Sequence, residues 1–363
     1  GELETKIYEE AGETFNINSP KQLGEILFDK MKIKGGKKTK TGYSTDSEVL
    51  EGLYDMHPIV PMILEYKTLT KLCSTFIDGL LPLIDKQGRV HTCFNQSVTA
   101  TGRISSTEPN LQNIPVRTQL GREIRKAFVA SEGRVLVDAD YSQIELRLLA
   151  AMSGDEGMCR AFTEGTDIHR RTASEVFGVP FDEVTSEMRS AAKAVNFGIV
   201  YGISDFGLAR QLGISRKEAA RYIELYFMRY PGVHTYLKGC VERAKQQGAA
   251  TTLFGRRREM PELKSSNYNT RSFGERVAMN MPIQGTAADI IKLAMVRVHN
   301  ELKARGMKSE LILQIHDELI IDAVQEEADA AAEILKSCME NVINLKVPLL
   351  AEVHTGHSWF DTK

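Results

Sequence analysis

Apolar residues in this chain form strand-like runs on either side of a long stretch with helical spacing. One strand-like run, residues 135–140, lies near the middle of the chain, and two more lie at 311–315 and 319–321. Residues 156–247, which separate the two strand regions, have the three-to-four-residue apolar spacing of helices. We therefore expect one sheet platform interrupted by a helical subdomain.

The pattern ahead of the first strand predicts a separate helical piece. Residues 1–33 are expected to be mainly helical, with Asn18-Ser19-Pro20 as a turn or helix start, and residues 46–81 are expected to form two more helices. Residues 89–94 alternate in the manner of a strand, and a final helix is expected over 326–342.

Two aspartates end the strand at 135–140, and an apolar pattern typical of a helix follows at once. Because side chains alternate along a strand, Asp138 and Asp140 are expected to point to the same face. Carboxylates at the end of a buried strand are costly unless they are solvated, paired or bound to a metal. The alternative is that Asp140 or Ser142 caps the following helix, a position that Asp and Ser favour.

A second acidic site lies at the turn of the predicted hairpin over 311–323. Its tip carries His316, Asp317 and Glu318 in place of the Asn-Gly or Asp-Gly that such turns favour. An exposed tip without function is the alternative. If the two acidic sites meet, they could share two Mg²⁺ ions roughly 3.5–4 Å apart, an arrangement suited to phosphoryl transfer.

A stripe of cations and aromatics lies on one predicted helix of the helical subdomain. Arg189, Lys193, Phe197 and Tyr201 are four residues apart, so they lie along one slowly winding face. The cations suit a nucleotide triphosphate, and the aromatics suit a base or sugar. The alternative is an amphipathic helix with aromatics in the core and cations in solvent. His169 is a further candidate phosphate donor, although a lone His is more often structural.

Charge and composition change this picture only slightly. A length of 363 residues suggests two or three domains, and a net charge of −2 weakly opposes nucleic-acid binding. Local clusters can override the total. The lysine-rich residues 32–42 are either a solvated loop or a clamp on phosphates, and the polar residues 99–117 suit contacts with a sugar-phosphate backbone and base edges.

The remaining composition sets the expected compartment. Five widely separated cysteines, an odd number with no CxxC pair, argue against a disulfide framework or structural zinc and favour a reducing compartment. No apolar run is long enough to span a bilayer, so we expect no membrane association. The chain begins at Gly1 rather than Met, so we expect it to be part of a longer polypeptide.

Three segments resemble the motifs of a known family. The segments DYSQIELR (140–147), RSAAKAVNFGIVYG (189–202) and QIHDEL (314–319) look like motifs A, B and C of the family A DNA polymerases, the bacterial DNA polymerase I type. The segments TGRISSTEPNLQNIP (101–115) and NMPIQGTAADIIK (280–292) are also similar to that family. The resemblance covers essentially the whole chain, in the right order and spacing.

The resemblance implies an α+β fold of the right-hand type, with an antiparallel-sheet palm, helical fingers and a helical thumb. Residues 1–88 would be a partial thumb, 89–155 the first part of the palm, 156–274 the fingers and 275–363 the second part of the palm. The start of the thumb and the upstream exonuclease-like domain of family members have no counterpart in this sequence. It would therefore be a C-terminal polymerase fragment.

The resemblance also implies a reaction and its partners. The chain would be a template-directed, DNA-dependent DNA polymerase, in which a primer 3′-oxygen attacks the α-phosphate of a dNTP and releases pyrophosphate. Two Mg²⁺ ions would serve as cofactors, with Mn²⁺ able to substitute. Primer-template DNA and dNTPs would be the partners of a monomer, alone or with an N-terminal portion of the same polypeptide. The expected location is the cytoplasm of a bacterial or phage-infected cell, or an organelle.

Family likeness assigns roles to individual residues. Asp140 and Asp317 would be catalytic and metal-binding, the backbone carbonyl of Tyr141 would reach a metal, and Glu318 would support the site. The expected nucleotide-binding residues are Arg189, Lys193, Phe197, Tyr201, His169, Glu145 and Gln143. The expected DNA-binding residues are Arg103, Arg276, Asn280, Gln284, His316, Asn110 and Gln112.

Three of these positions carry a more specific implication. Glu145 resembles the steric gate that excludes a ribose 2′-hydroxyl, and Phe197 in place of Tyr implies discrimination against dideoxynucleotides. Asp138 departs from the family, which usually has a small or uncharged residue there. It would tune the metal site, face water or face a basic partner.

Three other functions compete with this one. A single-subunit RNA polymerase shares the palm chemistry, but Glu145 argues against it because the gate should reject ribonucleotides. A two-metal nuclease would explain the carboxylates but not the stripe at 189–201. A binding module without catalysis is opposed by the presence of both Asp140 and Asp317.

Overall fold

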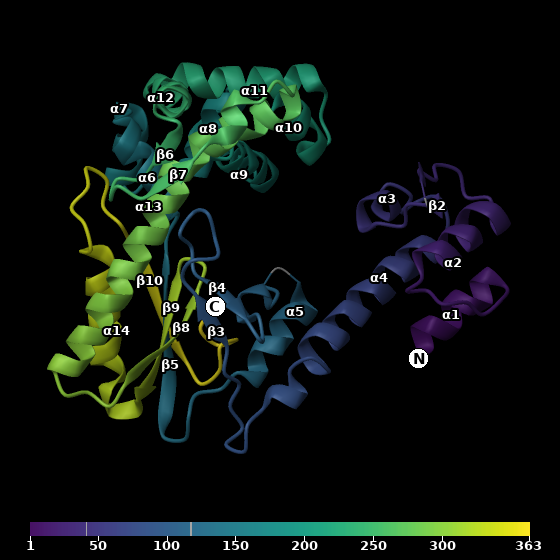
Figure 1. Cartoon of the computed structure of the whole chain (residues 1–363), viewed down its shortest axis with the longest axis horizontal. Helices are drawn as coiled ribbons and strands as arrows, with labels where there is room; N and C mark the ends of the chain where they lie inside the picture. The colour runs from purple at the N-terminus through teal and green to yellow at the C-terminus, as the bar shows by residue number, and fades with distance from the viewer. Residues whose placement is uncertain (41, 117) are drawn as a thin grey trace. The chain divides into compact units, whose positions relative to one another are not determined.

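The computed structural model describes residues 1–40, 42–116 and 118–363, which form two compact units, Gly1–Thr92 and Cys93–Lys363 (Figure 1). Thr41 of the lysine-rich loop and Arg117 of the polar stretch lie outside the described residues. Within the described part of the chain, no helix is both long and apolar enough to cross a membrane. All five cysteines are free, as the sequence predicts.

The first unit is helical around its own small core, as expected. Its elements are α1 (Glu2–Ala11), α2 (Pro20–Gly24), a π-helix (Glu25–Lys30), β1 (Lys38–Thr39), β2 (Gly42–Tyr43), α3 (Ser47–Glu51), α4 (Ile59–Leu72), a second π-helix (Cys73–Ile77) and a 3₁₀-helix (Leu81–Leu83). Ser19 caps α2 and Pro20 occupies its first turn, which confirms the predicted helix start. Ile7, Leu27 and Ile63 are fully buried in the core.

Two predictions for this part of the chain need correction. The lysine-rich loop contains a short hairpin, because Lys38 and Thr39 of β1 pair with Tyr43 and Gly42 of β2. The strand predicted at 89–94 forms only over its last two residues. Val90 makes only an isolated bridge to Ile84, and the strand β3 is Cys93–Asn95. Alternation marks extended backbone, but a strand also needs a partner with free backbone groups.

A four-stranded antiparallel sheet forms the base of the second unit (Figure 1). Its strands are β5 (Arg134–Tyr141), β8 (Glu310–Ile315), β9 (Glu318–Val324) and β10 (Ala351–Gly356), in the order β10-β5-β9-β8. The strands predicted at 135–140 and over 311–321 are therefore confirmed. A small two-stranded sheet joins β3 to β4 (Ser105–Thr107), and short helices at Leu111–Asn113, Gln119–Ile124 (α5) and Arg125–Ala127 follow.

One face of the sheet is covered by α13 (Tyr268–Ala304) and α14 (Ala328–Glu340), which confirms the predicted final helix. Val137, Ala139 and Tyr141 of β5 belong to the core that these helices share with the sheet. Because side chains alternate, Asp138 and Asp140 lie on the opposite face, as expected. In this way the apolar half of β5 fixes the orientation of its acidic half.

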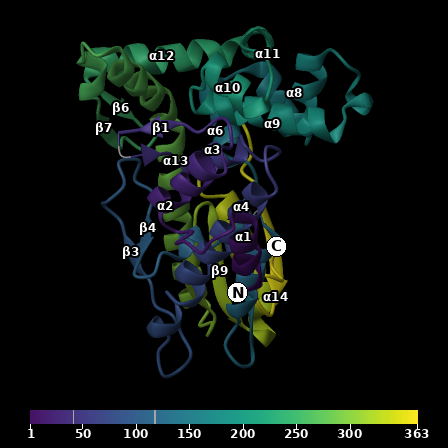
Figure 2. The same cartoon turned by 90° about the vertical axis from the view of Figure 1, so that its right-hand side faces the viewer.

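The predicted helical subdomain is also present, and Figures 1 and 2 show it gathered beyond one end of the sheet. Its elements, after α6 (Ile144–Ser153), are α7 (Glu156–Thr163), α8 (Ile168–Phe177), a 3₁₀-helix (Phe181–Glu183), α9 (Ser186–Val200), α10 (Asp205–Leu212), α11 (Arg216–Arg229), α12 (Pro231–Gln247), β6 (Ala249–Thr251) and β7 (Arg257–Glu259). 3₁₀-helices at Pro261–Lys264 and Gln325–Glu327 precede α13 and α14. The long helix α13 runs from this subdomain along the sheet (Figure 1).

One buried carboxylate holds two helices of this subdomain. Asp155 is 4% exposed, and its Oδ1 caps α7 by accepting from the Met158 amide at 2.9 Å. Its Oδ2 accepts from the Gly232 amide, in the first turn of α12, also at 2.9 Å. Asp155 therefore satisfies N–H groups at two helix starts that have no intrahelical partner.

We expect Asp155→Ala to lower the free energy of unfolding by about 2–4 kcal/mol, because it removes a cap and leaves a second buried N–H unpaired. Ser204→Ala is the matched control, since the Ser204 hydroxyl caps only α10, through the Gly207 amide at 3.1 Å. It should cost about 1 kcal/mol. Urea denaturation measures both, and equal losses would contradict the double role of Asp155.

Candidate active site

Strand pairing brings the two predicted catalytic carboxylates to the same place. Asp140 of β5 is paired in register with Glu318, the first residue of β9, and Asp317 immediately precedes it in the turn. The Tyr141 amide donates to the Asp317 carbonyl at 3.1 Å and so ties the end of β5 to this turn. The side chains of Asp140 and Asp317 are 50% and 28% exposed, so both remain accessible to a ligand.

The alternative interpretation of Asp140 as a helix cap is wrong. The residue that precedes α6 is Gln143, in a left-handed conformation with φ 54°, and no side chain caps the helix. Neither Asp140 nor Ser142 has that role. His316, in the other turn, also has a positive φ of 54°. Backbone conformations that cost energy at non-glycine residues often occur at functional sites, and here they occur on both sides of the carboxylates.

The electrostatics of the two carboxylates favour a cation. Burial raises the pKa of Asp317 to about 6, with further increases from Glu145 and Asp140 that Arg103 opposes. Burial also raises the pKa of Asp140, an effect that Lys363 opposes. A divalent cation would relieve this cost of holding negative charges close together.

The donor set fits a metal that also takes ligands from its substrate. Among the described residues no cluster of three or more His, Cys, Asp or Glu side chains could hold a metal ion alone. Magnesium typically keeps several waters and uses one or two carboxylates with substrate phosphates. Asp140 and Asp317 match this pattern.

A buried glutamate links three parts of the second unit above the carboxylates. Glu145 of α6 is 4% exposed, and its Oε1 accepts from Arg103 Nη2 at 2.8 Å. Its Oε2 accepts from the Tyr201 hydroxyl at 2.7 Å, and Arg103 Nη2 also lies 3.8 Å from Asp317 Oδ1. Arg103 and Tyr201, far apart in sequence, therefore meet at Glu145, and Arg103 links this cluster to Asp317.

A cavity of about 170 Å³ adjoins this cluster and collects several of the predicted DNA-binding residues. Its lining includes Arg103, Gln112, His316 and Asp317. The Gln112 amide donates to the Ile104 carbonyl at 3.2 Å, which holds it at the cavity wall. Asn110 does not line the cavity. Its Oδ1 accepts a hydrogen bond from the backbone N–H of Gln112 at 3.0 Å and so supports the turn.

Three predicted DNA-binding residues share one face of α13. Arg276, Asn280 and Gln284 are four residues apart on this helix. The Asn280 Nδ2 is buried and has no hydrogen-bond partner among the described residues. Arg276 packs against Gly202, whose φ is +66°. The face therefore adjoins the end of α9.

Gln143, the residue that precedes α6, also has a buried polar atom. Its Oε1 is without a hydrogen-bond partner in the described part of the chain.

The predicted phosphate-binding residues lie on α8 and α9. Arg189 Nε donates to Asp167 Oδ2 at 2.7 Å, and Lys193 is exposed. The His169 and Phe197 rings lie 5.7 Å apart between their centroids. Phe197 is partly buried against the core, whereas Tyr201 is 43% exposed, so the stripe is neither wholly in the core nor wholly in solvent.

His169 is held in one orientation by a buried network. The Asn196 Oδ1 accepts from the Thr172 hydroxyl at 3.2 Å, which leaves the Asn196 Nδ2 to donate to His169 Nδ1 at 3.0 Å. Nε2 then carries the proton and is the nitrogen free to donate. His169 is 2% exposed, and burial lowers its pKa to about 4.

Asp167 and Asn196 are functional candidates that the sequence analysis missed. Asp167 caps α8, accepting from the amides of His169 at 3.0 Å and Arg170 at 3.1 Å, while it pairs with Arg189. Its position directly before an apolar-periodic segment is a cap signal that could have identified it. Nothing in the sequence marks Asn196, because its role depends on the packing of α9 against α8.

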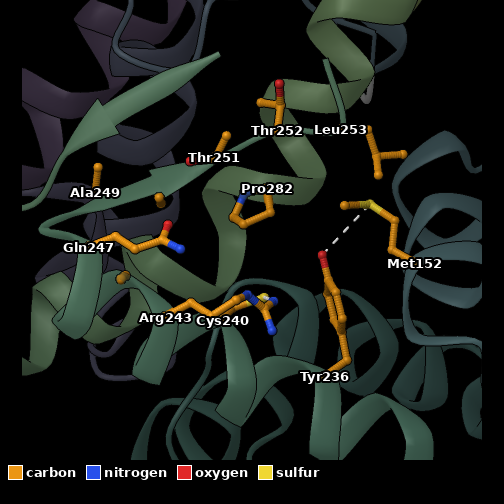
Figure 3. Close-up of a pocket in the computed structure, with 12 residues that line it drawn as sticks. Met152, Tyr236, Cys240, Arg243, Gln247, Ala249, Thr251, Thr252, Leu253 and Pro282 are labelled. Atoms are coloured by element: carbon orange, nitrogen blue, oxygen red, sulfur yellow. Dashed lines mark hydrogen bonds between the residues drawn. The ribbon is translucent and has the colours of Figure 1, made fainter. Parts of the chain in front are cut away.

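A second cavity, of about 210 Å³, lies away from the carboxylates, between α12, the β6 hairpin and α13 (Figure 3). Tyr236 points across it, and its hydroxyl lies 3.8 Å from the Met152 sulfur. Arg243 donates to the Cys240 sulfur at 3.2 Å from the same helix. None of its described lining residues is acidic.

Comparison with known proteins agrees with this geometry. The family model described as DNA polymerase family A matches residues 1–361, so the chain belongs to this family. Among its curated relatives, DNA polymerase I of Caldicellulosiruptor bescii is 59% identical over 99% of the chain and 43% of that protein. DNA polymerase I of Bacillus subtilis is 56% identical, over 100% of the chain and 41% of that protein.

A solved structure gives the same result for the fold. The POL domain of Pol1 from M. smegmatis, in complex with DNA primer-template and dNTP, has a TM-score of 0.94 at 46% identity and covers 99% of this chain and 64% of that one. The predicted α+β polymerase fold is thus confirmed. The chain spans about two fifths of the length of the curated relatives named above.

The low pKa of His169 predicts a contribution to acid sensitivity. Between its ordinary pKa of 6.5 and about 4, the unfolded chain takes up a proton that the folded chain does not. The contribution of the neutral imidazole is therefore complete above pH 6.5 and is lost as the pH falls, by about 3 kcal/mol at pH 4.

Urea denaturation of the parent and His169→Gln at several pH values tests this. The stability advantage of the parent should shrink as the pH falls from 7 to 4. Asn300→Gln, at an exposed position on α13 that does not titrate, should show no such trend. A constant difference between parent and His169→Gln would contradict a neutral buried imidazole.

Proposed function

We propose that this chain is a template-directed, DNA-dependent DNA polymerase that joins a dNTP to a primer 3′-hydroxyl and releases pyrophosphate. The observation that carries the proposal is the meeting of Asp140 and Asp317 beneath the Arg103–Glu145–Tyr201 cluster. Membership of DNA polymerase family A and the likeness to a polymerase domain bound to primer-template and dNTP support it.

Asp140, Asp317 and the backbone carbonyl of Tyr141 would hold two Mg²⁺ ions, with Mn²⁺ as a substitute. Bound there, the ions would activate the primer 3′-oxygen and stabilise charge on the α-phosphate and on the departing pyrophosphate. Each carboxylate has one cation of the protein beside it: Arg103 lies 3.8 Å from Asp317, and Lys363 lies 3.6 Å from Asp140. Glu318 would support the site from β9.

Residues of α8 and α9 would hold the incoming nucleotide. Arg189, Lys193 and the Nε2–H of His169 would contact the triphosphate. Asp167 would restrain Arg189 until the phosphates replace it as the partner of the guanidinium. Phe197 would lie beside the sugar and base and disfavour dideoxynucleotides, and Tyr201 would lie near the templating base.

Glu145 would act as the gate against a ribose 2′-hydroxyl. Its buried carboxylate is held from both sides, by Arg103 and by Tyr201, so it cannot easily move away from an added hydroxyl group. Gln143, with its unpaired Oε1, would contact the nucleotide from the start of α6.

Primer-template DNA would lie across the sheet face that carries the carboxylates. Its proposed contacts are Arg103, Asn110, Gln112, Arg276, Asn280, Gln284 and His316. Residues 1–88 would be the thumb, 89–155 and 275–363 the palm, and 156–274 the fingers; the first compact unit ends at Thr92, close to the proposed thumb boundary. We propose that the protein acts as a monomer in the cytoplasm.

Other activities make distinct predictions. A single-subunit RNA polymerase would use ribonucleotides efficiently, whereas the buried gate at Glu145 should reject them. A nuclease would shorten labelled DNA without extending it. A binder without catalysis would retain primer-template and never extend it at any Mg²⁺ concentration.

The primary test is extension of a recessed primer with Mg²⁺ and all four dNTPs. The parent should extend to the template end, while Asp140→Ala and Asp317→Ala should each lose at least about 10³-fold in rate, because each removes a charge that the reaction needs. Asp329→Ala, an exposed acid on α14, is the control and should match the parent.

DNA binding by the same variants decides what a failure means. If all of the proteins bind the duplex and none extends it, the catalytic proposal is wrong for this chain. If Asp140→Ala extends normally, the assigned role of Asp140 is wrong while the polymerase activity stands.

The gate makes its own prediction. Glu145→Ala should raise the ratio of rNTP to dNTP incorporation by at least about tenfold, because it removes the group that meets the 2′-hydroxyl. Single-nucleotide incorporation kinetics measure this ratio. Glu145→Gln keeps the size of the side chain and should change the ratio far less; equal changes in the two variants would point to charge rather than size.

A further inference from the structure

Asp138 has no role in the proposed reaction, yet it is one of the most deeply buried acids in the described chain. Its side chain is 1% exposed, on the same face of β5 as Asp140. Asp138 therefore does not face water. Its Oδ1 is buried and has no hydrogen-bond partner among the described residues. A carboxylate in this position needs a compensating charge.

Lys363 supplies that charge and joins three acids at once. Its ammonium nitrogen lies 3.4 Å from Asp138 Oδ2, 3.6 Å from Asp140 Oδ2 and 3.0 Å from Glu318 Oε2. Two of the three acids are buried, and only Asp140 is half exposed. The ammonium thus lies between two buried acids and the proposed metal ligand.

The segment that carries Lys363 is itself fixed to the sheet. Trp359, 1% exposed, donates its Nε1–H to Glu318 Oε1 at 2.7 Å, and the Thr362 hydroxyl donates to Asp138 Oδ2 at 3.0 Å. The backbone amide of Trp359 donates to the Phe128 carbonyl at 2.8 Å. The Arg125 guanidinium carbon lies 3.9 Å from the Trp359 ring centroid. These contacts fix the segment that carries Lys363, and so they hold its ammonium in position.

We propose that Lys363 is a positioning residue, a fixed counter-ion that Asp138 and Glu318 hold beside Asp140 and that thereby weakens cation binding there. This inference rests on the proposed function in one respect, that Asp140 binds the divalent cation. It also gives Asp138 its role, as the anchor that holds the ammonium beside the site.

The position of the ammonium gives the direction of the effect. At separations of 3.0 to 3.6 Å the ammonium acts strongly on each acid and opposes a second cation beside Asp140. Its removal should therefore strengthen cation binding at Asp140 and leave the buried Asp138 without its partner. Asp138→Asn should relieve only the second effect, because it removes the buried acid and leaves Asp140 unchanged.

The first experiment measures Mn²⁺ affinity by electron paramagnetic resonance on the full chain bound to primer-template, without nucleotide. Lys363→Met should bind Mn²⁺ about three- to tenfold more tightly than the parent, and Asp138→Asn/Lys363→Met should bind it about as tightly as Lys363→Met, because both lack the ammonium beside Asp140. Lys126→Met is the matched control: its ammonium lies 4.6 Å from the Phe360 ring and 2.6 Å from Glu123. It should leave the affinity unchanged.

The second experiment measures thermal unfolding of the same set without metal or DNA. Lys363→Met should lower Tm by about 3–6 °C, and the double variant should recover most of that loss. Unchanged Mn²⁺ affinity in Lys363→Met overturns the proposal, even when Tm falls, because the role is then only structural. Additive losses of Tm in the double variant also overturn it.

These readouts separate the inference from the proposed function. Asp140→Asn should abolish the tight Mn²⁺ site; if it does not, the proposed metal role of Asp140 is wrong. If the site depends on Asp140 and is insensitive to Lys363, only the counter-ion inference is wrong. Neither the Mn²⁺ affinity nor the thermal unfolding measurement depends on primer extension activity.

Discussion

The pairing register of β5 with β9 is the constraint on which the candidate site depends. Asp140 lies opposite Glu318 only in this register, and a shift by one residue would turn every side chain of a strand to the other face. Burial prevents that shift. Val137 and Ala139 of β5, with Ile321 of β9, are fully buried in the core shared with α13 and α14. The apolar side of the sheet therefore fixes the position of the acids on its other side.

The groups that surround the carboxylates come from elements with their own rigid support. Glu145 follows the strand directly on α6, while Tyr201 reaches it from the end of α9 and Arg103 from the polar stretch after β3. His169 is oriented by Asn196 on the facing helix. The site is thus assembled at the junction of sheet and helical subdomain, where a change in packing of either would alter its geometry.

The sequence predicts the helices and strands far better than it predicts which strands and side chains contact one another. The strands, the hairpin and the helices were predictable because burial on one face produces periodicity. Arg103 and Glu145, 42 residues apart, or Thr362 and Asp138, 224 apart, leave no such signal. The strand predicted at 89–94 forms only at 93–95 for the same reason, since alternation does not reveal where a partner strand lies. Roles such as the gate at Glu145 came only from family resemblance and remain predictions.

The central claim is that this register makes Asp140 and Asp317 joint ligands of divalent cations at the point of nucleotide addition. Anomalous diffraction from crystals of the chain with primer-template, a non-hydrolysable dNTP and Mn²⁺ tests it most directly. The account predicts manganese peaks in contact with both carboxylates and the nucleotide phosphates. Peaks absent from these two carboxylates, with DNA and nucleotide bound, would contradict it.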